Sequence, residues 1–219
     1  MRALHFITCL GILSLGLGGC GNKNDQTLGS LESGVVQKKP RVAFVPTLDH
    51  SHHRLGWNVA GELTAGIYET LQQKDHCQLT NLNKIKNLSD AHDPFSSDIS
   101  WVKQMFAGNE FVVFTALLEH SEKPSYPTDK VALSDSPTDL KIVLQIRVID
   151  VRGEVPKIIL QEAVEKSRHI PRQFSCFNFP QVAWGAPMYT FSPMGVVHAE
   201  LMDEIAHRVE DYIVLAGEK

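Results

Sequence analysis

Three histidines and an aspartate stand together in the stretch Asp49-His50-Ser51-His52-His53. Imidazole nitrogens and carboxylate oxygens are side-chain ligands for Zn²⁺, Cu²⁺ or Ni²⁺. A complete site also needs a further ligand and supporting hydrogen bonds from elsewhere in the chain. One interpretation is therefore a metal site built on His50, His52 and His53. The other is a polar, acid-sensitive loop between a strand and a helix.

Aromatic residues and prolines are concentrated in residues 171–194. The aromatic side chains are Phe174, Phe177, Phe179, Trp184, Tyr189 and Phe191. Prolines in the segment exclude a long helix. Aromatic side chains are favoured at the centres of protein–protein interfaces, so all six are candidate partner contacts. The alternative is that they pack over their own domain, because large apolar patches are rarely left exposed.

Signatures of catalysis are missing from the sequence. It contains no GxSxG, HExxH, Walker loop or dinucleotide-binding glycine pattern. We therefore expect no enzyme and no cofactor, although a hydrolase whose site is assembled from scattered residues remains an alternative. The formal net charge of −4 comes without a basic patch, so nucleic acid is not an expected partner.

The first twenty residues have the order of a secretory signal peptide. Arg2 precedes the uncharged apolar run 6–17, which is shorter than the ~20 residues that span a bilayer. Gly18 and Gly19 then supply small residues before Cys20, as expected next to a cleavage site.

Residues 17–20, Leu-Gly-Gly-Cys, resemble the lipobox of bacterial lipoproteins. The resemblance implies cleavage before Cys20 and a covalent lipid, diacylglycerol with palmitate, on its thiol. Gly21 is not an aspartate, and by resemblance to enteric lipoproteins this favours the periplasmic face of the outer membrane.

Three regions follow from this interpretation. Residues 1–19 are the signal peptide, and 20–40 are the lipidated N-terminus with a polar tether that lacks the apolar content to fold alone. Residues 41–219 are long enough for a single globular domain with its own core. Cys77 and Cys176 belong to this domain. They either form a disulfide, which an oxidising compartment permits, or remain two buried thiols.

Hydrophobic periodicity predicts a mixed α/β (α+β) domain. About five strands are predicted, at 41–47, 77–81, 111–118, 139–151 and 157–165. About three helices are predicted, at 56–74, at 96–107 and from Pro193 onward with Ser192 as the cap. The order is β-α-β-α-β-β-β-α, with a long polar loop at 119–138. Helices packed on a mixed sheet give this fold class.

The element order resembles that of small envelope lipoproteins. A lipobox, a tether, the strand RVAFVP, an amphipathic helix, the strand FVVFTALL, a long hairpin and a terminal helix occur in that order. The group includes penicillin-binding-protein activators of the LpoB type, the PelC and curli-secretion (CsgG) lipoproteins and the N-terminal domain of TolB. The chain is also similar to uncharacterised chlamydial lipoproteins.

The resemblance implies a lipid-anchored, non-enzymatic scaffold, assembly or interaction component of the envelope. Its partners would be the membrane, through the anchor, and another envelope protein or further copies of itself. A metal-binding lipoprotein using His50, His52 and His53 is the first alternative function.

Overall fold

The computed structural model describes residues 38–53, 55–85, 92–126, 136–174 and 183–217. By contacts the chain divides into residues 1–37 and residues 38–219, and all the described residues belong to the second unit. The predicted signal peptide, Cys20 and most of the tether therefore lie outside the described residues.

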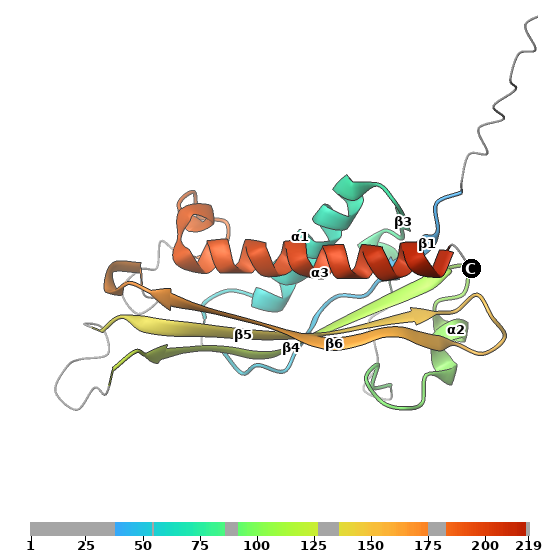
Figure 1. Ribbon diagram of the computed structural model, residues 1–219, viewed down its shortest axis with the longest axis horizontal. Coiled ribbons are helices and arrows are strands. Elements are labelled where there is room, and N and C mark those ends of the chain that lie inside the picture. Colours follow the sequence, from blue (N-terminus) through green and yellow to red (C-terminus); the bar gives the residue numbers. More distant parts are fainter. Residues whose placement is uncertain (1–37, 54, 86–91, 127–135, 175–182, 218–219) are drawn as a thin grey trace, which may run out of the picture. The chain divides into compact units, whose positions relative to one another are not determined.

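A six-stranded mixed sheet with three α-helices forms this unit (Figure 1). The strands are β1 (Arg41–Phe44), β2 (Leu48–Asp49), β3 (Gln78–Leu79), β4 (Phe111–Pro124), β5 (Thr138–Asp150) and β6 (Lys157–Ile170). The helices are α1 (Val59–Lys74), α2 (Ser100–Met105) and α3 (Pro193–Gly217). The main path of the sheet is β3-β1-β4-β5-β6, and β2 pairs with β4. The predicted fold class and element order are confirmed, with the two-residue β2 as an addition.

The central strand of the sheet is the most apolar one. In β4 the first seven residues, Phe111–Leu117, are all buried, and the strand lies between the parallel β1 and the antiparallel β5. A strand in that position has both faces covered, so it needs no polar alternation. In β5 the alternating Leu140, Ile142, Leu144 and Ile146 are fully buried and all face the main core, as their period of two predicts.

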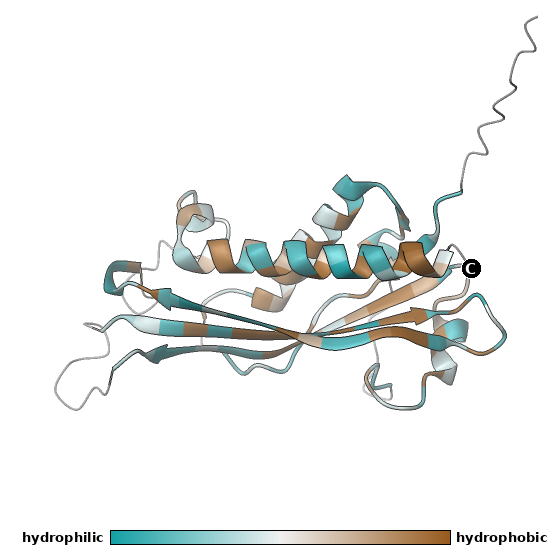
Figure 2. Cartoon of the chain, viewed as in Figure 1, coloured by the Kyte–Doolittle hydropathy of each residue, from teal (hydrophilic) through white to brown (hydrophobic). Residues whose placement is uncertain are grey.

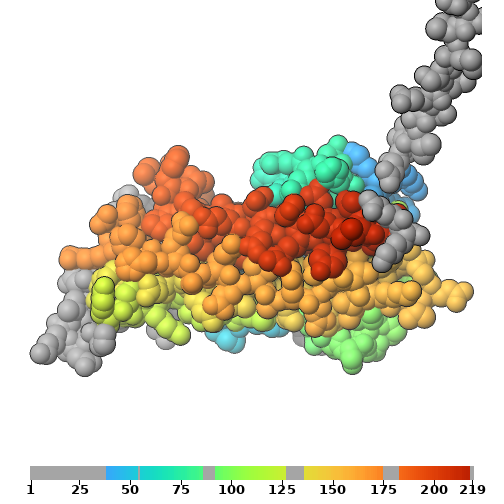
Figure 3. Space-filling model, viewed as in Figure 1, coloured from blue at the N-terminus to red at the C-terminus, as the bar shows by residue number. Residues whose placement is uncertain are grey.

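Helices α1 and α3 cover one face of the sheet, and α2 lies on the other (Figure 1). Along its length α3 carries both hydrophobic and hydrophilic residues, which is the pattern of a helix with one buried face (Figure 2). The same helix lies along β6 on the face seen in Figure 3. Ion pairs connect the two elements: Arg208 with Glu162, Lys166 with Glu204, and Arg168 with Glu200.

A buried arginine attaches the segment before α2 to the sheet. Arg147 of β5 is only 3 % exposed and donates to the carbonyl oxygens of Pro94, Phe95 and Ser96 at 2.6–2.8 Å. It also donates to Oε1 of Gln161 at 2.6 Å. The guanidinium thus organises the segment that leads into α2, and α2 covers the smaller core cluster on this face.

Two strands are longer than their apolar patterns predict. Residues 119–124 continue β4 as a strand, so the loop predicted at 119–138 is wrong for its first six residues. Likewise, β6 extends to Ile170 instead of ending at 165. The extra residues are largely polar, but they pair in register with the first half of β5. Backbone pairing with β5 therefore extends both strands into polar residues. The prediction ended the strands earlier because it relied on apolar runs.

The start of α3 is capped as predicted, and it fits closely against the preceding turn. The Oγ of Ser192 accepts from Gly195 N at 3.0 Å. A Cβ on Gly195 would collide with the backbone carbonyl of Tyr189, which cannot move aside as a flexible side chain would. Gly195 therefore permits close contact between α3 and the turn before it.

We expect Gly195→Ala to lower the free energy of unfolding by about 1–3 kcal/mol, the usual cost of overpacking. Urea denaturation measures the change. Gly217→Ala, at the other end of α3, is the matched control because a Cβ there meets nothing within 4 Å. Equal stability of the two variants would contradict the close fit.

Candidate functional site

A carboxylate is buried between α1 and α3 and accepts hydrogen bonds from other elements. Glu62 of α1 accepts from Nε1 of Trp57 at 2.9 Å and from the hydroxyl of Tyr189 at 2.5 Å. Its Oε1 also lies 2.9 Å from Nδ1 of His198 in α3. Burial, followed by the negative charge of Glu62, raises the pKa of Tyr189, so the phenol stays protonated and donates. Three donors from separate segments therefore converge on one carboxylate.

The cluster continues from α3 into the sheet through two histidines. Nε2 of His198 lies 3.0 Å from Nε2 of His120 in β4, with the two rings nearly perpendicular. Both side chains are buried. Burial, together with the nearby His198, lowers the pKa of His120 to about 3, so this ring is neutral at neutral pH.

A third histidine leads toward the surface. His53 lies after β2, and its ring centroid is 5.6 Å from that of His120. Its Nδ1 accepts from Leu55 N at 3.2 Å, so a neutral His53 carries its proton on Nε2, which lies 3.1 Å from Oδ2 of Asp49. Asp49 is exposed, and it lines a cleft of about 390 Å³ beside the first turns of α1. We call the series Asp49, His53, His120, His198, Glu62, Tyr189 and Trp57 the buried polar cluster.

Sequence analysis found only part of this cluster. It singled out Asp49 and His53, within a histidine-rich stretch, and Tyr189, within the aromatic segment. Glu62, His120 and His198 were missed because they share no motif and are far apart in the sequence. Glu62 and His198 are separated by 136 positions. A usable signal existed, because His198 shares the helical face of Leu201 and Ile205, both buried. A titratable residue on an apolar face is a candidate for a buried hydrogen-bonding role.

The part of the chain that the structure describes shows no complete set of metal ligands. There, no three His, Cys, Asp or Glu side chains are grouped so that they could hold an ion. His53 uses both of its ring nitrogens with Leu55 and Asp49. His50 and His52 are both exposed. Metal binding at His50, His52 and His53 stays a prediction.

The aromatic segment divides into buried and exposed residues. Tyr189, in a short 3₁₀ turn (Tyr189–Phe191), is 5 % exposed, and Phe174 packs against the main core. Trp184 and Phe191 are 45 % and 77 % exposed, respectively. Phe177 and Phe179 lie outside the described residues. Self-packing therefore holds for Tyr189 and Phe174, and partner contact through the aromatic segment stays a prediction.

Only one of the two cysteines of the predicted disulfide lies within the described residues. Cys77 is half-buried and has no disulfide partner in the described ranges, while Cys176 lies outside them. Burial, together with the negative charge of Glu210, raises the pKa of the Cys77 thiol to about 11. Cys77 is thus a protonated, poorly nucleophilic thiol, and the bridge to Cys176 stays a prediction.

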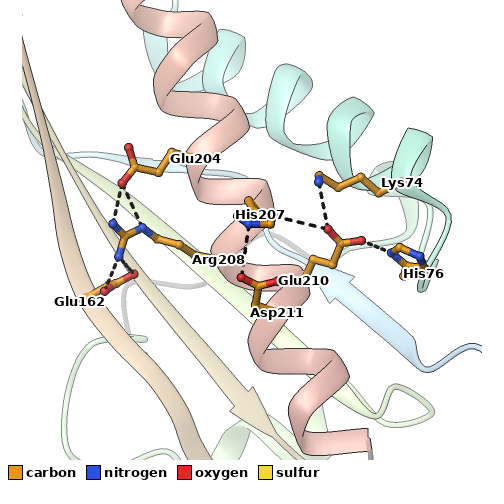
Figure 4. A network of polar contacts seen from close by, with 8 residues as sticks. All are labelled: Lys74, His76, Glu162, Glu204, His207, Arg208, Glu210 and Asp211. Atoms are coloured by element: carbon orange, nitrogen blue, oxygen red, sulfur yellow. Dashed lines mark hydrogen bonds and ion pairs between the residues drawn. The ribbon is translucent and has the colours of Figure 1, made fainter.

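A second polar network joins the far ends of α1 and α3 (Figure 4). Glu210 of α3 pairs with Nζ of Lys74 at 3.0 Å and with His76. Although burial opposes it, the hydrogen bonds from His76 and Lys74 lower the pKa of Glu210. The same view shows Arg208 between Glu162 and Glu204. These contacts attach α3 to its neighbours at the surface, in contrast to the buried polar cluster.

None of the helices in the described ranges has the length and apolar character needed to cross a membrane.

Comparison with solved structures finds a chlamydial protein and bacterial lipoproteins. The hypothetical protein CT253 from Chlamydia trachomatis is 23 % identical, with a TM-score of 0.64, covering 80 % of this chain and 98 % of that one. Lipoprotein GNA1162 from Neisseria meningitidis is 15 % identical, with a TM-score of 0.43, covering 77 % and 99 %. The PelC dodecamer from Paraburkholderia phytofirmans is 12 % identical, with a TM-score of 0.39, covering 76 % and 86 %.

At 23 % identity the similarity to CT253 concerns the fold alone. No curated protein matches the sequence significantly. A family model, in contrast, matches residues 31–217, which include every element described above. The chain belongs to the family of unknown function DUF7499.

Proposed function

We propose that the chain is a lipid-anchored, non-enzymatic protein of the bacterial envelope that binds another envelope protein through an exposed apolar surface. The lipobox-like residues 17–20 support the anchor, with Cys20 as the lipid-bearing residue. Anchoring places the protein at the periplasmic face of a membrane, where another envelope protein is an accessible partner.

Three exposed apolar side chains that are close in sequence support the interaction proposal. Trp184, Met188 and Phe191 are 45 %, 62 % and 77 % exposed, all within eight residues. We call them the apolar surface. Trp is enriched among the residues that dominate interface energies, and methionine adapts to irregular partner surfaces.

The backbone of the segment that carries the apolar surface is hydrogen-bonded within itself. Ala186 N, Tyr189 N and Phe191 N each donate to the carbonyl three residues earlier, at 3.0–3.2 Å. The buried hydroxyl of Tyr189 attaches the same segment to Glu62. A preordered segment loses little conformational entropy on binding, which favours affinity.

Site-specific photo-cross-linking in intact cells tests the proposal. A photoreactive phenylalanine analogue at position 188 should capture one envelope protein reproducibly. The matched position is Val155, which is 70 % exposed in the β5–β6 turn, at the end of the sheet opposite the start of α3 (Figure 1). Capture only of this chain would indicate self-association instead, and equal capture at both positions would contradict a specific surface.

Phe191→Ser is expected to weaken partner binding by about 2 kcal/mol, roughly 30-fold, as for a typical interface hot spot. Folding stability should change little because the ring is largely exposed. Cross-linking yield from position 188 measures the binding, and thermal unfolding measures the stability. Val155→Ser, which removes another exposed apolar side chain, should leave the yield unchanged. An unchanged yield with Phe191→Ser would exclude the apolar surface as the contact.

A further inference from the structure

Two histidines of the buried polar cluster meet through identical atoms. Nε2 of His120 and Nε2 of His198 are 3.0 Å apart, a hydrogen-bonding distance. A ring nitrogen either carries a proton and donates or has a lone pair and accepts. The contact therefore needs one proton between the two atoms. If both rings are doubly protonated, two N–H groups and two positive charges face each other without solvent between them.

The other side of His198 is occupied by an acid. Nδ1 of His198 faces Glu62 Oε1 at 2.9 Å and the Tyr189 hydroxyl at 2.7 Å. The distances allow His198 to donate from Nδ1 to Glu62 while one proton lies between its Nε2 and that of His120. In such an arrangement the two rings carry at most one positive charge, and Glu62 lies beside it. A second positive charge has no such partner.

Titratable groups face the pair from each neighbouring element. They are Glu62 from α1, Tyr189 from the 3₁₀ turn, and His53 with Asp49 from the segment that follows β2. Glu122 lies two residues beyond His120 on the same face of β4, and its Oε1 accepts from the Thr138 hydroxyl. Asp49 is exposed and keeps His53 at its side, whereas Glu62 is already bonded to three donors. Oε2 of Glu122 is buried without a hydrogen-bond partner in the described residues. The additional charge on His120 would thus lie at a buried position, and this burial is the main cause that disfavours it.

We propose that the His120–His198 contact is an acid-sensitive switch, which holds the first turns of α3 and the segment 183–192 against β4 and α1 and releases them when both rings are protonated. Tyr189 connects the contact to the segment because its hydroxyl bonds both His198 and Glu62. The inference concerns a movement within this chain and does not depend on the partner proposed above.

The direction of the pH dependence follows from the two forms of His120. In the closed form its pKa is lowered to about 3, chiefly by burial, whereas a solvated imidazole has a pKa of about 6.5. Between these values the open form binds a proton that the closed form excludes. The closed form is therefore fully favoured above about pH 6.5 and is progressively lost as the pH falls toward 3.

Hydrogen–deuterium exchange of the full-length protein in detergent tests the switch. Protection of the peptide covering 183–192, corrected for intrinsic exchange, should fall at least about tenfold between pH 7 and about pH 4.5. A peptide within 140–148 of β5 should stay protected over the same range. Protection should return on neutralisation. Retained protection of 183–192 at about pH 4.5, or its loss together with that of β5, would overturn the switch.

Variants at the two rings assign the effect. His120→Gln offers an amide oxygen that accepts from His198 but does not titrate, so loss of protection should move at least about one pH unit lower. His198→Gln should shift it in the same direction and replaces the first variant if that one fails to fold. His207→Gln, on the exposed side of α3, is the control and should behave as the wild type. A midpoint unchanged in both ring variants contradicts the assignment.

Discussion

Glu62→Ala is expected to lower the free energy of unfolding by about 3–5 kcal/mol, the range found when one partner of a buried charged pair is removed. The carboxylate accepts from Trp57 and Tyr189 and lies against His198, and each of these groups comes from a different segment. Without Glu62, three donors lose a buried acceptor. The loss includes their desolvation as well as the missing hydrogen bonds.

Urea denaturation of Glu62→Ala and Glu69→Ala measures the difference. Glu69 lies two turns along the same helix and is exposed, with a weak contact to Gln73 at 3.4 Å. Glu69→Ala is the control, because it makes the same Glu-to-Ala change in the same helix. It should lower the free energy of unfolding by less than about 0.5 kcal/mol. Glu62→Gln keeps one acceptor oxygen and should fall between the two. If Glu62→Ala and Glu69→Ala unfold at the same urea concentration, the buried polar cluster contributes nothing to stability.

The regular parts of the fold could be predicted because their sequences carry clear periods. Residues 139–151 alternate, residues 111–118 are uniformly apolar, and Ser192 with Pro193 marks the start of a helix. Each signal is local, so one sequence suffices to detect it. The ends of β4 and β6 were misjudged because polar residues there are fixed by pairing with β5, which is not a local property.

The candidate site could not be predicted in the same way. Metal-binding and catalytic motifs are recognised by short spacings, whereas Glu62 and His198 are brought together only by the packing of α1 on α3. The histidine-rich stretch drew attention to His50 and His52, yet His53 is the one that lies against another buried ring. The clustering of a residue type in the sequence is therefore a weaker guide here than the face on which each residue falls.

The buried polar cluster and the apolar surface share one segment. Tyr189 is buried and hydrogen-bonded, while Met188 and Phe191 on either side of it are largely exposed. A change that frees Tyr189 would therefore also alter the presentation of its neighbours. The link is mechanical, through consecutive backbone hydrogen bonds of the 3₁₀ turn. Partner binding and the pH response are separable, because Phe191→Ser should affect only the first and His120→Gln only the second.

Cys20→Ser is expected to move the protein from the membrane fraction to the soluble fraction. A single acyl chain gives only marginal membrane binding, with an association constant of about 10⁴ M⁻¹, so two or more chains are needed for lasting attachment. Serine removes the thiol on which all of them depend. None of the helices in residues 38–53, 55–85, 92–126, 136–174 and 183–217 is long and apolar enough to replace the anchor as a membrane span.

Labelling with radioactive palmitate and fractionation after a carbonate wash measure the effect. The wild type should incorporate label and stay with the membrane, and Cys20→Ser should do neither. Cys77→Ser is the matched control, because it removes a half-buried thiol of the folded domain and should keep both label and location. If Cys20→Ser remains labelled and membrane-bound, the lipid is attached elsewhere and the proposed position of the apolar surface at the periplasmic face loses its support. If label is lost but the protein stays on the membrane, adding Phe191→Ser to Cys20→Ser tests whether the apolar surface holds it there.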